Sequence, residues 1–132
     1  MICFLPSMIK TTYREIGKFL EERARIGEPI TYSQVIAQFP ELPQLTAAWR
    51  SHPLCDMFGE LDREDERQKL PFRTALVVGQ KSGRPGQGFF DTITKLRNQP
   101  ISKSQRDEVW SKEFTSLVNR YSKPLRDGAL MR

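Results

Sequence analysis

The chain has 132 residues, of which 38% are hydrophobic, and this size suits one compact domain with a single core rather than two full domains. Its net charge is +5, and the whole excess falls in residues 95–132, which hold 9 basic and 4 acidic side chains against 12 of each in residues 1–94. Two cysteines and a single histidine argue against a disulfide framework and a histidine-based metal centre, so no metal and no other cofactor is expected.

The beginning of the chain predicts a helix, a short strand and a second helix. Aromatic and aliphatic residues recur at helical spacing over residues 7–26, and Gly27 is a natural end for that helix. Residues 28–30 predict a short extended piece, because a proline keeps the residue before it out of helical conformation. Thr31, or alternatively Ser33, then caps a short helix by accepting hydrogen bonds from its first amides.

A third helical region follows. Thr46 is a plausible cap for it, and Pro53 predicts a kink or a break between two shorter helices. Residues 60–69 hold five acidic and three basic side chains in alternation, which predicts that this segment is exposed.

Residues 70–90 predict a β-hairpin with a basic tip. Residues 74–78 are apolar and partly β-branched, as in a buried strand. The glycine- and proline-rich turn that follows carries Lys81 and Arg84. Phe89 and Phe90, which follow the turn, begin the expected second strand of the hairpin.

The C-terminal part predicts a short helix or packing segment over residues 89–96, a break at residues 98–100 and one last helix. Ser102 or Ser104 caps this helix, which runs to about Tyr121 with an apolar stripe. A basic tail follows.

The order of helix, strand, two helices, hairpin and helix predicts a mainly α fold with a small β-hairpin. We expect a winged helix, that is, a helix-turn-helix followed by a wing, with an added C-terminal helix. Residues 1–98 form the expected winged-helix core. Residues 99–132 form a C-terminal helix and basic tail that pack on the same domain or extend it.

Two motifs resemble the DNA-binding domain of alkylguanine-DNA alkyltransferases and alkyltransferase-like proteins. One is Pro29-Ile30-Thr31-Tyr32-Ser33-Gln34-Val35-Ile36, which is similar to the strand-to-helix entry of that family. The other is Leu70-Pro71-Phe72-Arg73-Thr74-Ala75-Leu76-Val77-Val78 with the glycines after it, which is similar to the family's Pro-Cys-His-Arg-Val-Val stretch. The resemblance covers about residues 28–90 and implies a winged-helix DNA-binding fold.

The same comparison implies that alkyl transfer is lost. In that family a cysteine thiolate takes an alkyl group from a flipped base. Here Phe72 stands near the place of the cysteine and Arg73 near that of the activating histidine, and an aromatic ring cannot accept the alkyl group. We therefore expect no enzymatic activity, and residual activity would require covalent modification of Cys55.

The leading interpretation is a non-enzymatic module that binds double-stranded DNA through its third helical region and basic wing. Polar residues amid core positions supply the candidate contacts, in which Arg50 reaches a base edge and the others contact the backbone or flank it. The candidates are Gln44, Thr46, Arg50, Ser51, His52, Lys81 and Arg84. We expect the aromatic residues at helical or strand spacing to pack in the core, with base stacking as the alternative: Trp49, Phe58, Phe89, Phe90, Trp110 and Phe114.

The alternative is a protein-interaction module of the same fold, such as a small effector or inhibitor encoded on a mobile element. Its wing, its charged run at residues 60–69 and its basic last helix would then bind a protein partner. No apolar run in the sequence is long enough to span a membrane, so a cytoplasmic protein without a membrane partner is expected.

Overall fold

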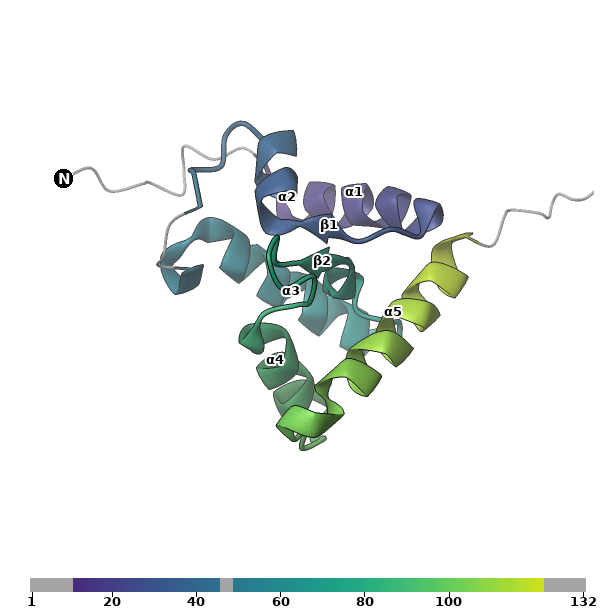
Figure 1. Ribbon diagram of the computed structural model, residues 1–132. Helices are drawn as coiled ribbons and strands as arrows, with labels where there is room; N and C mark the ends of the chain where they lie inside the picture. The colour runs from purple at the N-terminus through teal and green to yellow at the C-terminus, as the bar shows by residue number, and fades with distance from the viewer. Residues whose placement is uncertain (1–10, 46–48, 123–132) are drawn as a thin grey trace, which may run out of the picture.

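The computed structural model describes residues 11–45 and 49–122 and shows a mainly helical protein with a small two-stranded sheet (Figure 1). The helices of the described residues are α1 (Tyr13–Ile26), α2 (Tyr32–Gln38), α3 (Pro53–Arg67), α4 (Gln87–Arg97) and α5 (Arg106–Ser122). The strands are β1 (Ile30–Thr31) and β2 (Val77–Val78). Three 3-10 turns connect these elements: η2 (Trp49–Ser51), η3 (Arg73–Leu76) and η4 (Lys103–Gln105).

The ends of α1 and α2 follow from local chemistry. Thr12 caps α1 by accepting from the amide of Glu15, and Gly27 ends the helix with a φ of 83°, which a residue without a Cβ adopts readily. The cap of α2 is Thr31, as predicted. Thr31 and Gln34 form a capping box in which each side chain accepts from the other residue's backbone amide.

The predicted break at Pro53 is confirmed. Pro53 is the first residue of α3, where its missing amide hydrogen costs nothing, and His52 caps the helix. Residues before this point form η2 rather than a longer helix.

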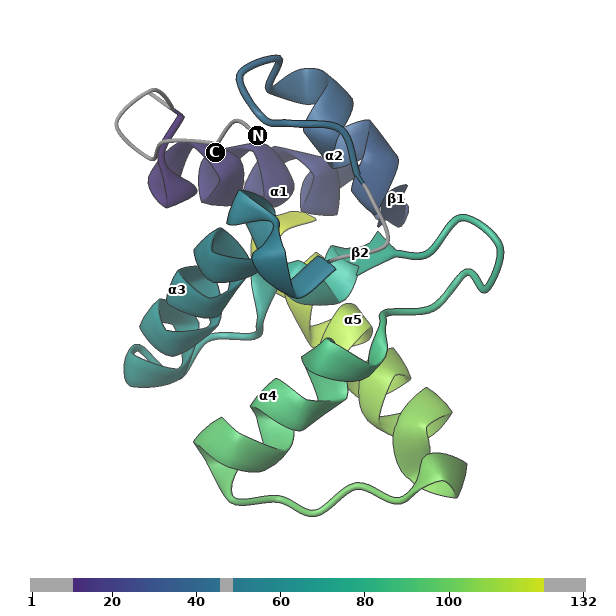
Figure 2. The ribbon, with the colours of Figure 1, turned by 90° about the vertical axis from the view of Figure 1, so that its left-hand side faces the viewer.

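The predicted hairpin at residues 70–90 is wrong. β2 pairs in parallel with β1, in the register Ile30↔Val77, and residues 86–90 do not return as a strand. Instead, residues 79–86 form a loop, here called the basic loop, which projects from β2 and leads directly into α4 (Figure 2). Phe89 and Phe90, which follow the loop, are buried in the first turn of α4. They pack in the core as helical residues and do not form a second strand of a hairpin.

The core gathers between α1, α3, η3, α4 and α5. α5 packs against α1 and η3, and Leu117 of α5 is fully buried. Trp110 of α5 fixes the position of η3, because its indole N–H donates to the carbonyl of Ala75 at 2.8 Å. Phe72, which aligns near the position of the cysteine in the resembling family, is fully buried. Its ring centroid lies 4.2 Å from Cζ of Arg97, so the guanidinium packs on the ring.

Part of the acidic run at residues 60–69 is buried, which corrects the prediction that this segment is exposed. Leu61, Asp62 and Asp65 have less than 5% of their surface exposed. Asp65 accepts hydrogen bonds from the backbone and the guanidinium of Arg73, at 2.9 and 3.1 Å. The same guanidinium also pairs with Glu21 of α1, so one buried cation joins α1, α3 and η3.

None of the helices described here is long and apolar enough to cross a membrane.

Candidate functional site

A cavity of about 710 Å³ is lined by residues of α2, η2, α3 and the start of α4. Three aromatic side chains line one part of it: Tyr32 at the start of α2, Trp49 of η2 and Phe58 of α3. Their ring centroids lie 5.2 Å apart for Tyr32 and Trp49 and 5.9 Å apart for Trp49 and Phe58, with the rings inclined to one another. We call this cavity the aromatic pocket.

The start of α4 forms another part of the lining of the aromatic pocket. Gly86, Gln87 and Gly88, which join the basic loop to α4, belong to this part. The hydroxyl of Tyr32 accepts a hydrogen bond from the amide of Gly86 at 3.0 Å, so α2 fixes the place where the basic loop ends. Burial raises the pKa of Tyr32, so the phenol stays neutral at physiological pH.

Asp91 and Asp62 both line the aromatic pocket; Asp91 is exposed, and the buried carboxyl group is that of Asp62. Its Oδ1 accepts a hydrogen bond from the hydroxyl of Thr74 at 2.7 Å. Only 4% of Asp62 is exposed, and burial raises its pKa to about 7. The pocket therefore combines an aromatic lining with an acid that is partly neutral at physiological pH, an arrangement suited to a planar ring with polar edges.

The structure places two of the predicted contact residues on the basic loop. Lys81 and Arg84 are exposed, and Arg84 pairs with Asp107 of α5 at 3.1 Å. The loop is ordered by its own hydrogen bonds: the amide of Gly79 donates to the carbonyl of Arg84, and that of Gly83 donates back to Gly79, each at 2.9 Å. A fixed loop presents its cations at a smaller cost in conformational entropy than a mobile one does.

The other predicted contacts are scattered. Ser51 is exposed and lines the aromatic pocket, and Gln44 is exposed nearby in the chain. Thr46 and the side chain of Arg50 lie outside the described part of the structure.

His52 has a structural role instead. Only 5% of it is exposed, and both ring nitrogens are engaged within the protein. Nδ1 accepts from the amide of Leu54 at 3.0 Å, and Nε2 lies 2.8 Å from the carbonyl of Pro43. The ring also stacks on Trp49, so His52 supports the wall of the pocket and is not presented to an external ligand.

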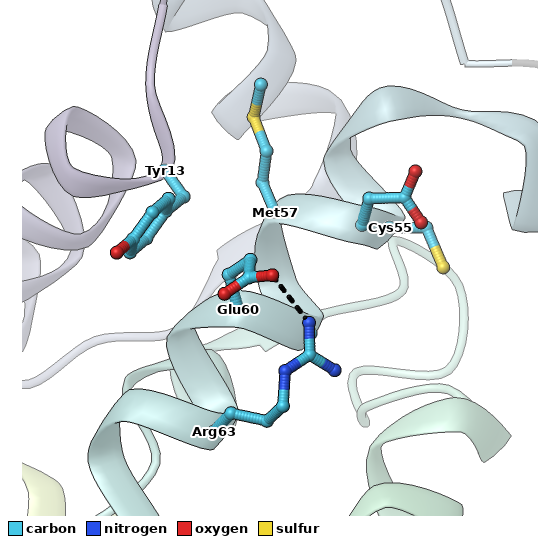
Figure 3. Close-up of a pocket in the computed structure, with 7 residues that line it drawn as sticks. Tyr13, Cys55, Met57, Glu60 and Arg63 are labelled. Carbon is cyan, nitrogen blue, oxygen red and sulfur yellow. Dashed lines mark hydrogen bonds and ion pairs between the residues drawn. The ribbon is translucent and has the colours of Figure 1, made fainter.

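A second, smaller cavity of about 380 Å³ is lined by residues of α1 and α3 (Figure 3). Tyr13 of α1 and six residues of α3 line it, and Glu60 and Arg63 form an ion pair there at 2.8 Å. Cys55 lines both cavities. This cavity holds no buried polar group comparable to Asp62, so the aromatic pocket is the stronger candidate site.

The sequence analysis missed Asp62 and Thr74. A signal was present, because Asp62 lies four residues after Phe58 and therefore on the same face of α3. Reading residues 60–69 only as a charged run hid that spacing. The contact with Thr74 depends on the fold, since η3 brings that hydroxyl to α3.

Among the described residues, no group of three or more metal-ligating side chains is placed to hold a metal ion. No family model, no curated protein and no solved structure matches the chain.

Proposed function

We propose that the protein is a non-enzymatic DNA-binding module that holds one unstacked base in its aromatic pocket. The observation that carries this proposal is that the pocket and the basic loop are continuous. The loop presents Lys81 and Arg84 and then runs into Gly86, which lines the pocket. A phosphate contact and a base contact can therefore be made within a few residues of one another.

The basic loop supplies the phosphate contacts in this proposal. Backbone phosphates are bound mainly by lysine and arginine, without special spacing. The ion pair between Arg84 and Asp107 has both side chains about 60% exposed, and such pairs contribute only about 0–1 kcal/mol. A phosphate can therefore displace Asp107 from Arg84.

The aromatic pocket supplies the base contact. A base taken out of a duplex is held by stacking on aromatic rings and by hydrogen bonds to its edge. Tyr32, Trp49 and Phe58 provide the rings, and Asp62 and Thr74 provide the polar groups. This use fits the family that the sequence resembles, which acts on flipped bases. Alkyl transfer itself is not part of the proposal, because Phe72 is buried away from the pocket.

A salt titration of binding to duplex DNA tests the phosphate contacts. We expect the Lys81→Ala, Arg84→Ala double variant to reduce the slope of log K against log salt by about 2, because each lost phosphate contact removes roughly 0.9. Lys18→Ala, which removes an exposed lysine of α1, should leave the slope unchanged. Asp107→Asn should raise the affinity, since it frees Arg84.

A comparison of matched and mismatched duplexes tests the base contact. A mismatched base costs less to unstack, so the protein should bind the mismatched duplex more tightly. Trp49→Ala should reduce that preference, because stacking on an aromatic ring contributes about 1–3 kcal/mol per base. Equal binding of both duplexes by the native protein would refute the base contact while leaving the phosphate contacts standing.

The charge of α3 favours a protein partner as the second candidate. A helix that enters a DNA groove is usually basic, whereas α3 carries six acidic and two basic residues. If duplex DNA fails to bind even at low salt, the basic loop and the outer face of α3 are the surfaces to test by capture of a protein partner.

A further inference from the structure

Asp62 differs from Asp65, the other buried acid of α3, in having one oxygen available to a ligand. Oδ1 accepts from Thr74 at 2.7 Å, whereas no hydrogen bond to Oδ2 is found among the described residues. Asp62 is 96% buried and lines the aromatic pocket, so its remaining hydrogen-bonding capacity is directed to whatever occupies that pocket.

The cations near Asp62 are paired with other groups. Arg73 binds Asp65, Glu64 and Glu21, and Arg63 binds Glu60. A buried carboxylate without an ion pair is costly, so the neutral acid is favoured in this position. The rise of the Asp62 pKa to about 7, caused first by burial, agrees with this geometry.

A neutral carboxylic acid offers a donor and an acceptor side by side. With Oδ1 accepting from Thr74, the proton resides on Oδ2, and the second lone pair of Oδ1 remains available. The complementary ligand edge places an acceptor next to an N–H donor. Among planar rings, an amidine-type edge has this arrangement, because its basic ring nitrogen accepts the acid proton while the neighbouring amino group donates to Oδ1.

We propose that Asp62 selects the ring held in the aromatic pocket and favours an amidine-type edge, as adenine, cytosine and 2-aminopurine present. This inference rests on the proposed role of the pocket as a base site and names the chemistry that the site reads. The aromatic residues hold any planar ring, and Asp62 decides which ring edge binds well. The ring can come from a base within DNA or from a free nucleoside.

The titratable and charged groups around Asp62 come from every element packed against it. They are Tyr32 of α2, Cys55, Arg63 and Asp65 of α3, Arg73 of η3 and Asp91 of α4. Burial raises the pKa of Asp62 to about 7 and raises that of Tyr32 above its usual value, so Asp62, and not Tyr32, changes charge on the pocket wall near neutral pH.

Calorimetric titration of the full-length protein with two free ribosides tests the proposal. One is 2-aminopurine riboside, and the other is purine riboside, which lacks the amino donor. We expect 2-aminopurine riboside to bind about tenfold more tightly than purine riboside, which is the contribution of one well-formed hydrogen bond to a buried group. Equal affinities for the two ribosides would overturn the proposal.

The pH dependence gives a second measurement. Only the neutral acid donates to the ring nitrogen, and with a pKa of about 7 its population falls about tenfold between pH 6 and pH 8. The affinity for 2-aminopurine riboside should fall by the same factor. Asp62→Asn keeps one donor and one acceptor and should bind equally at both pH values, whereas Asp62→Leu should lose at least tenfold at pH 6. Tighter binding at pH 8 by the native protein would overturn the proposal.

Thr74→Val is a second variant, which tests the role of Asp62 even if the Asp62 variants change the fold. The Thr74 hydrogen bond lowers the pKa of Asp62, so its removal should move the midpoint of the pH dependence upward. A midpoint that stays in place or moves downward would count against Asp62 as the group responsible.

The ring can come from a base within DNA or from a free nucleoside, and repeating the titration with 2-aminopurine placed at a mismatch in duplex DNA distinguishes these two sources. Binding of the free riboside alone, with Asp62 dependence, supports this inference and refutes the DNA function. Binding in DNA alone, with Asp62 dependence, supports both proposals. DNA binding without Asp62 dependence supports the proposed function and overturns this inference, and failure of both ligands to bind overturns both.

Discussion

Replacing Asp62 by Asn should stabilise the protein, and the gain should grow with pH. Asp62 is 4% exposed and has no ion-pair partner among the described residues, so its negative charge is poorly solvated in the folded state. Asn keeps the acceptor for the Thr74 hydroxyl and carries no charge. The substitution therefore removes the cost of ionisation without removing the hydrogen bond.

The size of the effect follows from the rise in pKa. The pKa of Asp62 rises from 3.8 to about 7, which at 1.36 kcal/mol for each pKa unit corresponds to a cost of about 4 kcal/mol. The folded state holds its proton to higher pH than the unfolded state does. Stability from this group is therefore fully present below pH 3.8 and is lost progressively as the pH rises to about 7.

Urea unfolding at a series of pH values measures this effect. Between pH 4.5 and 8, the difference in unfolding free energy between Asp62→Asn and the native protein should grow by about 3 kcal/mol, most of the total. Asp56→Asn is the matched control, because Asp56 is exposed on the same helix. There the difference should vary by less than about 1 kcal/mol, the usual limit for an exposed charge in the first turn of a helix.

A flat difference for Asp62→Asn over this pH range would refute the argument that Asp62 is buried without a compensating charge. It would imply that a cation or water reaches the carboxylate in solution. The inference about ring selection would then lose its neutral acid as well.

Substitutions at four further positions test the packing around the site by urea unfolding. Gly17→Ala should destabilise the protein by about 1–3 kcal/mol, because the new Cβ would lie 2.5 Å from Nη1 of Arg73. Gly59→Ala in α3 is the control: its Cβ meets only ordinary contacts, so it should stabilise the protein by about 0.5–1 kcal/mol. Equal effects of the two substitutions would refute the close packing of α1. His52→Ala should cost about 0.5–2 kcal/mol through the lost helix cap, with His52→Asn recovering most of it, and a neutral His52→Ala would mean that the cap does not form. Arg73→Met should cost about 3–5 kcal/mol because the carboxylate of Asp65 is left buried without a charged partner, and a change below 1 kcal/mol would show that the network is solvated.

Local signals in the sequence predicted most of the helices and their ends. The Thr31 cap, the Gly27 stop and the break at Pro53 depend on neighbours within a few residues, and the structure confirms each of them. The hairpin failed for the opposite reason. The sequence pattern of a strand such as residues 77–78 does not show whether its partner is the next segment or one that lies nearly fifty residues earlier. Only the tertiary structure shows that the partner is β1.

The candidate site could be predicted only in part. Lys81 and Arg84 could be placed on an exposed loop, because glycine and proline mark the turn around them. Histidine 52 could not be recognised as buried, because its partner at Pro43 depends on how the chain folds back before α3. The acidic run is a different case, because a local signal was present there: the buried Asp62 lies four residues after Phe58, on the same face of α3.

The sequence by itself determined a mainly helical protein with a basic, glycine-rich loop after a short apolar strand. These features arise from propensities, caps and turns, which act over a few residues. The tertiary structure decided that the strand pairs in parallel, that the loop ends at an aromatic pocket, and that Asp62 and Thr74 meet inside it. The physical reason is that burial and long-range contacts, unlike caps and turns, depend on which distant segments come together, and no local pattern encodes that choice.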